Sequence, residues 1–483
     1  MSRAGIVLVT QHADMREVLA PFGRGVVADE EGSVATAIEA ALSSPARARV
    51  IGVVLARLED PAGLGALADR ARDAGSALVA LPLAMPRAHD AALHAVARQH
   101  ALGVAGSLDS LLDACATMAA SALPRGPRVA IVCGSTPVAR DLAELAVRRG
   151  LDATLIDGRD RGLARTLGPS DIIALAGNDA RLPRALAPGR TIVRAEVPAG
   201  GGGRGTPARG AVRGGERLVA LLRLLQAVGR PRPKGTAKAS PRPNGIEPDA
   251  ARAILEGPAR VLSEPSSKRA LSPYGIPFGR EVLSTSASMA EQAARSMRPP
   301  LIAKIASPDL LDKLAGRGIL REITSRQGAR TAYHSLVRAA LRARADARIL
   351  GVLLSETIRG IAEVRIRAVR DPDLGFLIQL GGSGDLGLGL PPDPVMLVPA
   401  TRADVVELVA AAPVARYYDG SFGREPGDLR ALAETIARLV AFASDFRDSV
   451  SEVVLDPVVV RAKGQGVVAT DARVSVSPPK PGG

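Results

Sequence analysis

Short apolar runs alternate with alanine-rich helical patterns through the first 198 residues, and this alternation limits the folds open to the chain. The runs, rich in Val and Ile, are expected to be strands over residues 5–10, 49–55, 77–81, 128–133, 153–156, 171–176 and 191–193. Near-continuous apolar strands separated by helices are typical of a parallel sheet that helices cover on both faces. The pattern restarts at Arg128, so we expect two small doubly wound α/β domains, residues 1–124 and 125–198.

The second half of the chain has a different order of elements. A helix, a short strand and another helix are followed by hairpin-like strands over residues 350–380, a long helix near residues 428–446 and two final strands. This order predicts an α+β domain over residues 248–483.

The segment between the two halves, residues 199–247, is rich in Gly, Pro and basic residues. Residues 199–245 hold eight Arg and two Lys against one Glu, so nine of the fourteen net positive charges lie there. Such a composition is typical of a solvated linker, which one short helix over residues 216–228 would interrupt. The alternative, binding of nucleic acid or of an acidic partner through this segment, stays open.

Composition excludes several classes of protein. Aromatic residues make up 2% of the chain and Trp is absent, which argues against a stacking surface, so nucleic acid is an unlikely partner. The two cysteines, Cys115 and Cys133, cannot form a disulfide framework or a tetrahedral metal site. No apolar run is long enough for a signal peptide or a membrane helix, and we expect a cytoplasmic protein.

Lys304 is the most informative single residue, because it lies inside the apolar run Pro300–Pro308. A buried ammonium needs an anionic partner, here a phosphate or a carboxylate, whereas the alternative is a lysine whose amino group reaches the surface. Lys313 follows nine residues later, in a segment where Gly316 and Gly318 would let backbone amides approach phosphate oxygens.

Two aspartates complete this set. Asp456 and Asp471 each follow an apolar run, and pairing of these two final strands would bring both carboxylates together. Mg²⁺ could then relieve their repulsion. The alternative is that both are ordinary turn residues.

Several segments of the second half, in order and in spacing, resemble the ATP-grasp half of the NDP-forming acyl-CoA synthetases, such as ADP-forming acetate–CoA ligase. They are residues 268–277, 301–310, 312–319, 349–354, 363–372, 374–384, 398–399, 452–457 and 470–474. The first half looks like the two flavodoxin-like, succinyl-CoA-ligase-like domains of that family, on the evidence of residues 7–12, Glu59 and residues 126–132.

The resemblance implies a ligase that joins a small carboxylic acid to CoA at the expense of ATP, through a phosphorylated histidine. Lys304, Lys313, Gly316, Gly318 and Glu363 would then bind the nucleotide. Asp456 and Asp471 would hold Mg²⁺. Glu59 and His89 are the candidates for a catalytic role in the first half, and the catalytic residues are otherwise unassigned.

The sequence also departs from the family pattern. The family usually begins with a CoA-binding domain, which we expect to be missing here. We also expect the family's phosphohistidine segment to be skipped; His89, His94 and His100 are candidates by proximity, and a helix with surface histidines is the alternative. The family's Asp-Ile-Asn-Pro metal segment reads Val454-Leu-Asp-Pro457, so one metal carboxylate is replaced. We therefore expect either a ligase subunit, completed by a CoA-binding partner chain or by homo-oligomerisation, or a catalytically degenerate nucleotide-binding or regulatory protein.

Overall fold

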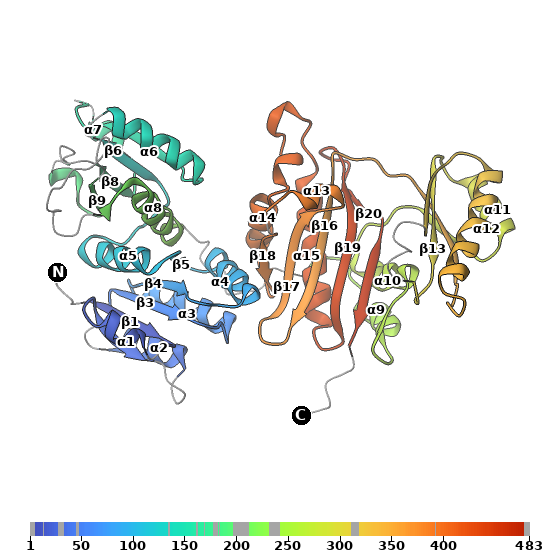
Figure 1. Ribbon diagram of the computed structural model, residues 1–483, viewed down its shortest axis with the longest axis horizontal. Coiled ribbons are helices and arrows are strands. Elements are labelled where there is room, and N and C mark those ends of the chain that lie inside the picture. The colour runs from blue at the N-terminus through green and yellow to red at the C-terminus, as the bar shows by residue number, and fades with distance from the viewer. Residues whose placement is uncertain are drawn as a thin grey trace. The chain divides into compact units, whose positions relative to one another are not determined.

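The computed structural model describes residues 5–12, 14–27, 33–44, 48–133, 136–160, 163–168, 170–176, 182, 184–196, 212–230, 242–310, 318–391 and 393–477. The chain forms two units, unit 1 over residues 1–237 and unit 2 over residues 238–483 (Figure 1). Among the described helices, none has the length and apolarity that a membrane crossing requires.

Unit 1 begins with a parallel sheet of five strands in the order β2-β1-β3-β4-β5. The strands are β1 (Ile6–Thr10), β2 (Arg24–Val27), β3 (Val50–Leu55), β4 (Ala77–Pro82) and β5 (Leu102–Val104). The helices are α1 (Met15–Leu19), α2 (Val34–Ser43), α3 (Pro61–Asp73), α4 (Arg87–Gln99) and α5 (Leu108–Ala120). Helix α3 begins where it does because the Asp60 carboxylate accepts a hydrogen bond from the Gly63 amide and Pro61 occupies the first turn.

A second parallel sheet follows in unit 1, with the order β10-β9-β8-β6-β7. The strands are β6 (Val129–Cys133), β7 (Ala153–Asp157), β8 (Ile172–Ala176), β9 (Thr191–Glu196) and β10 (Val212–Arg213), and the helices are α6 (Thr136–Arg148), α7 (Leu163–Leu167) and α8 (Gly215–Gly229). In each sheet the first strand along the chain lies between the second and the third, which is the flavodoxin-type doubly wound order. The predicted pair of doubly wound sheets is confirmed.

Helix α8 is the short helix predicted over residues 216–228, within the segment of residues 199–247. Its Leu218, Leu221, Leu222 and Leu225 are fully buried, and it packs against β5 of the first sheet and β8 of the second. One hydrophobic core therefore spans both sheets, and residues 1–237 form one compact unit. The apolar face of this helix is too wide to remain in solvent, whatever the composition of the flanking residues.

Unit 2 contains a large antiparallel sheet in the order β11-β21-β19-β16-β17-β18, with β20 paired to β19. The strands are β11 (Arg260–Val261), β16 (Ala362–Asp371), β17 (Gly375–Gly382), β18 (Val395–Leu397), β19 (Val450–Val460), β20 (Val467–Ala469) and β21 (Ala472–Val476). The helices of this part are α9 (Pro248–Leu255), α10 (Glu264–Leu271), α13 (Asp385–Leu388), α14 (Arg402–Ala411) and α15 (Leu429–Asp445). The core under the sheet includes Tyr274, Phe442 and Phe446, whose rings lie edge-on or tilted with centroids 4.9–5.9 Å apart.

A smaller antiparallel sheet of unit 2 has the order β12-β15-β13-β14. It consists of β12 (Glu281–Ser284), β13 (Leu301–Ala306), β14 (Ile319–Ile323) and β15 (Gly351–Glu356), and α11 (Ala287–Ser296) and α12 (Arg326–Ala343) share its core. The α+β prediction for this half is confirmed.

Truncation of a buried leucine in α8 tests whether this helix belongs to the core of unit 1. We expect Leu222→Ala to lower the free energy of unfolding by about 2–5 kcal/mol, because the truncation leaves a cavity between the two sheets. Arg223→Ala, at the exposed position beside it, is the matched control and should change stability little. Urea unfolding of the full chain measures both, and equal midpoints for the two variants would contradict a structural role for α8.

Candidate functional site

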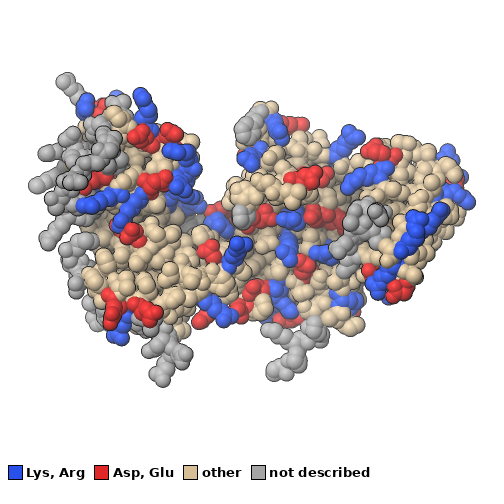
Figure 2. Space-filling view, in the orientation of Figure 1, with Lys and Arg blue, Asp and Glu red and all other residues tan. Residues whose placement is uncertain are grey.

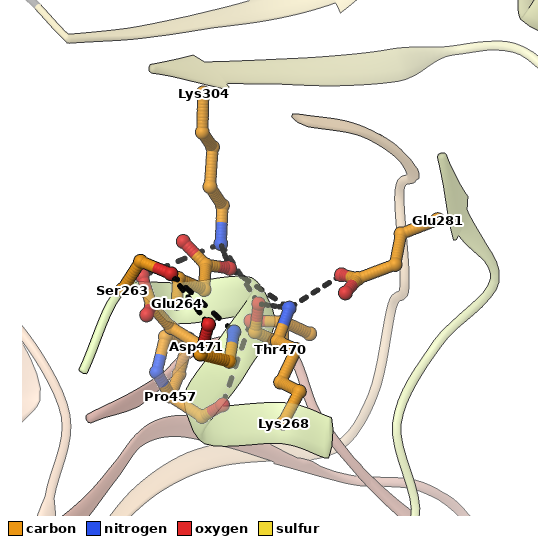
Figure 3. Close-up of polar contacts among 9 residues, drawn as sticks. Ser263, Glu264, Lys268, Glu281, Lys304, Pro457, Thr470 and Asp471 are labelled. Carbon is orange, nitrogen blue, oxygen red and sulfur yellow. Dashed lines mark hydrogen bonds and ion pairs between the residues drawn. The ribbon is translucent and has the colours of Figure 1, made fainter. Parts of the chain in front are cut away.

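Lys304 points from β13 into a group of oxygen atoms at the start of α10 and just before β21 (Figure 3). Its Nζ donates to Glu264 Oε1 at 3.1 Å, to the backbone carbonyl oxygen of Thr470 at 2.8 Å and to Asp471 Oδ2 at 3.4 Å. The side chain is 7% exposed, so the alternative of an amino group at the surface is excluded. The anionic partners that the sequence predicts for Lys304 are thus carboxylates of the same chain.

A second buried lysine, Lys268, lies beside Lys304. Its Nζ donates to Glu264 Oε1 at 2.8 Å, to Glu281 Oε2 at 2.5 Å and to the Thr470 carbonyl oxygen at 3.0 Å (Figure 3). Burial alone would lower the pKa of Lys268, but the carboxylates of Glu264 and Glu281 outweigh this effect, and the pKa is raised. The two lysines therefore share one carboxylate oxygen and one carbonyl oxygen.

Sequence reasoning missed the roles of Glu264, Lys268 and Glu281. The spacing of Glu264 and Lys268 by four residues on one helix was the available signal, since it places the two side chains on one face. Nothing in the sequence indicates that Glu281, from β12, reaches the same ammonium.

Asp456 lies on β19, and Asp471 lies immediately before β21, the strand that pairs with β19. Leu455 of β19 pairs with Ala472 of β21. Asp456 follows Leu455 and Asp471 precedes Ala472, so the two aspartates lie next to the same residue pair. Asp456 does not end its strand, since β19 continues to Val460. Burial is the main cause that raises the pKa of Asp456; the hydrogen bond from Ser383 Oγ to Asp456 Oδ1, 2.5 Å long, opposes the shift, and the charge of Asp471 adds to it.

Asp456 and Asp471 supply the type of oxygen donor that Mg²⁺ takes in proteins. Within the described ranges, no cluster of three or more His, Cys, Asp and Glu side chains could hold a metal ion by itself. Mg²⁺ commonly takes one or two carboxylates and completes its coordination with water and substrate phosphates. Bound Mg²⁺ would also remove the repulsion that Asp471 exerts on Asp456.

Two of the other predicted nucleotide-binding residues, Glu363 and Gly318, make backbone contacts close to Asp456 and Lys304. Glu363 is exposed on β16, and its carbonyl oxygen accepts a hydrogen bond from the amide of Ser383, the residue that contacts Asp456. Gly318 is buried, and its carbonyl oxygen accepts from the Ile305 amide, one residue from Lys304. Lys313 and Gly316 lie outside the described residues.

Arginine side chains add positive charge close to Asp456. Arg365 lies on the same face of β16 as Glu363 and forms an ion pair with Asp393 at 3.0 Å. The positive charges of Arg365 and of Arg473 from β21 partly oppose the rise in the pKa of Asp456. Lysine, arginine and carboxylate groups therefore converge on one region of unit 2, an arrangement suited to binding a polyphosphate with its metal ion.

The catalytic candidates of the first half lie in unit 1. His89 is buried on α4, with Nδ1 3.2 Å from the backbone nitrogen and 3.0 Å from the backbone oxygen of Leu58. Glu59 follows Leu58 and is exposed after β3, at the carboxyl edge of the sheet. His89 therefore holds the loop that carries Glu59, and a catalytic role for either remains a prediction.

Comparison with known proteins identifies the C-terminal half. Residues 253–476 match the family model of the ATP-grasp domain, and they include Lys304, Asp456 and Asp471. This half of the chain is similar to ADP-forming acid–CoA ligases and to their beta subunits.

The curated relatives are ADP-forming ligases. The beta subunit of acetate–CoA ligase (ADP-forming) II from Pyrococcus furiosus is 28% identical over 221 residues, which cover 46% of this chain and 94% of the relative. The 4-hydroxybutyrate–CoA ligase (ADP-forming) of Nitrosopumilus maritimus is 29% identical over 215 residues, 44% of this chain, so the chain spans only 31% of that longer protein. Among solved structures, the acetyl-coenzyme A synthetase 1 of Ca. Korarchaeum cryptofilum in complex with coenzyme A aligns with a TM-score of 0.42 at 25% identity, over 45% of this chain and 93% of that one.

Removal of the shared carboxylate tests the buried ion network. We expect Glu264→Gln to lower the free energy of unfolding by about 3 kcal/mol, because two ammonium groups then lose a common partner in a buried site. Asp346→Asn, which removes the carboxylate from an exposed pair with Arg344, is the control and should leave stability nearly unchanged. Urea unfolding compares them, and a Glu264→Gln variant as stable as the control would show that the network contributes little.

Proposed function

We propose that this protein is an ATP-dependent, NDP-forming acid–CoA ligase or a subunit of one. The observation that carries the proposal is the convergence of Lys304, Asp456 and Asp471 inside a domain related to the beta subunits of ADP-forming acetate–CoA ligases. Lys304 would contact nucleotide phosphates, and Lys313, Gly316, Gly318 and Glu363 would complete the nucleotide site.

The chain's own residues would act on charge and position. Lys304 would neutralise negative charge on the phosphates, and Glu264 with the Thr470 carbonyl would hold its ammonium in place while it does so. Asp456, oriented by Ser383, and Asp471 would hold Mg²⁺. When bound, Mg²⁺ supplies further charge neutralisation and aligns the phosphate that is transferred.

Unit 1 would serve the CoA and acid side of the reaction. Its two flavodoxin-type sheets agree with the succinyl-CoA-ligase-like domains that the sequence resembles, and the relatives include beta subunits of ligases. We propose that a partner chain with a CoA-binding domain, or a second copy of this chain, completes the enzyme. CoA and a small carboxylic acid would be the substrates, and the protein would act in the cytoplasm.

Product analysis tests the proposed reaction. The full chain, with and without a candidate CoA-binding-domain subunit, is incubated with ATP, Mg²⁺, CoA and a panel of short carboxylic acids. We expect an acyl-CoA and ADP, detected by mass spectrometry, in equal amounts. Formation of AMP, or nucleotide binding without product under every condition, would contradict the proposal, the latter in favour of a degenerate nucleotide-binding protein.

Lys304→Met is the informative variant for this assay. It removes the ammonium but keeps an unbranched side chain in the buried site, and we expect a loss of at least about 100-fold in the rate of ADP formation. Lys463→Met, an exposed lysine of the same unit, is the matched control and should retain the wild-type rate. Equal rates for the two variants would show that Lys304 takes no part in the reaction.

A further inference from the structure

A cavity of about 240 Å³ lies in unit 2 between α14, α15 and the segment that precedes α9. Its walls come mainly from Pro, Ala and Val side chains, and Arg242 and Asp445 are the charged side chains among them. We propose that this cavity binds a free α-amino acid with a branched aliphatic side chain, such as leucine. The inference goes beyond the proposed function and does not depend on it.

The cavity is separate from the proposed nucleotide site. Helices α14 and α15 cover one face of the large sheet (Figure 1), and Val405 and Val440, which line the cavity, belong to the same core as Leu455 of β19. Asp456 follows Leu455, and successive side chains of a strand point to opposite faces, so the Asp456 carboxylate lies on the other face of the sheet. A ligand in the cavity therefore leaves the residues proposed to bind nucleotide free.

The apolar walls have room for a branched aliphatic side chain. Val405 and Val440 are buried, whereas Ala437 and Ala441 of α15 are partly buried and leave space open because each carries only a methyl group. An apolar cavity of about 150 Å³ is enough to take up benzene. The larger cavity of this protein can hold a leucine side chain and still leave room for a polar head group.

Arg242 and Asp445 form an ion pair that leaves hydrogen-bonding capacity on both partners. Nη2 of Arg242 and the hydroxyl of Tyr274 both donate to Oδ2 of Asp445. Burial, together with the Asp445 carboxylate, raises the pKa of Tyr274, so its hydroxyl stays protonated and donates. Within the described part of the chain, Oδ1 of Asp445 accepts no hydrogen bond, and Arg242 donates only to Asp445, although a guanidinium has five N–H donors.

The two charges select the head group of the ligand. A simple carboxylic acid would pair with Arg242 but meet the like charge of Asp445, and a simple amine would pair with Asp445 but meet the like charge of Arg242. An α-amino acid carries both groups, so its carboxylate can accept from the free donors of Arg242 while its ammonium donates to Oδ1 of Asp445. The ion pair itself stays intact.

The wider surface does not supply this selectivity. Over the part of unit 2 that carries the large sheet, acidic and basic side chains are interspersed (Figure 2). A broad field of one sign would favour a ligand with a single charge, whereas a mixed surface favours neither. The choice of head group therefore rests on Arg242 and Asp445.

Calorimetric titration of the full chain with L-leucine tests the inference. Three analogues are the matched ligands: 4-methylpentanoate lacks the ammonium, 3-methylbutylamine lacks the carboxylate, and glycine lacks the side chain. We expect L-leucine to bind and each analogue to bind at least about tenfold more weakly, because each loses either a charge-assisted hydrogen bond or the apolar contact.

Two variants test where the ligand lies. The Arg242 side chain is 58% exposed, so Arg242→Gln should fold, and it should weaken L-leucine binding by about the same factor as removal of the ligand's carboxylate, because both changes remove the same contact. Ala441→Leu fills the cavity and should abolish binding. Ala410→Leu, at an exposed position of α14 outside the cavity, is the matched control and should bind L-leucine as wild type does.

The results that would overturn the inference are distinct from failure of the proposed function. No binding of L-leucine at millimolar concentration overturns it. An analogue with a single charge that binds as tightly as L-leucine overturns it as well, because the head group then does not need both charges. An Ala441→Leu variant that binds as tightly as Ala410→Leu shows that the ligand lies elsewhere. None of these measurements involves acyl-CoA formation, so the inference and the proposed function can each fail alone.

Discussion

One carboxylate oxygen, Oε1 of Glu264, holds two buried ammonium groups, and the arrangement of the ATP-grasp half depends on it. Lys268 comes from the same helix as Glu264, whereas Lys304 comes from the smaller sheet. Burial of either lysine without a counter-charge would cost more free energy than a domain of this size can spare. The interaction that satisfies the charges therefore also joins β13 to α10 and to the segment before β21.

Apolar packing and buried polar contacts hold the helices and strands of the two units in place. In unit 1, α8 contacts two sheets mainly through buried leucines, and Gly103 of β5 allows close approach, since a Cβ there would lie 2.8 Å from Val228 of α8. In unit 2, charged groups join β12 and β13 of the smaller sheet to α10 and to the segment before β21. Apolar packing tolerates small changes in volume, whereas a buried charge network requires each partner.

The sequence predicted the elements whose signals are local, namely the parallel strands of unit 1, the long helix α15 and the adjacency of Asp456 and Asp471. It favoured an anionic partner for Lys304 over an amino group at the surface, because burial of an ammonium without a counter-charge is costly. It could not identify Glu281 as a partner of Lys268, because their contact depends on how β12 packs against α10. It predicted a short helix over residues 216–228, which is α8, but it could not predict that this helix packs into the core of unit 1, because that depends on its contacts with β5 and β8.

Thr470 contributes its backbone carbonyl to both lysines, and this has a consequence for how the site can change in evolution. The contact does not depend on the identity of the side chain at position 470, so that position can vary while the oxygen stays in place. Position 264 has no such freedom, because only a carboxylate supplies a negative charge there. The two lysines thus have one contact that depends on the path of the backbone at Thr470 and one that depends on the side chain at Glu264. Only the second is lost by substitution of the side chain.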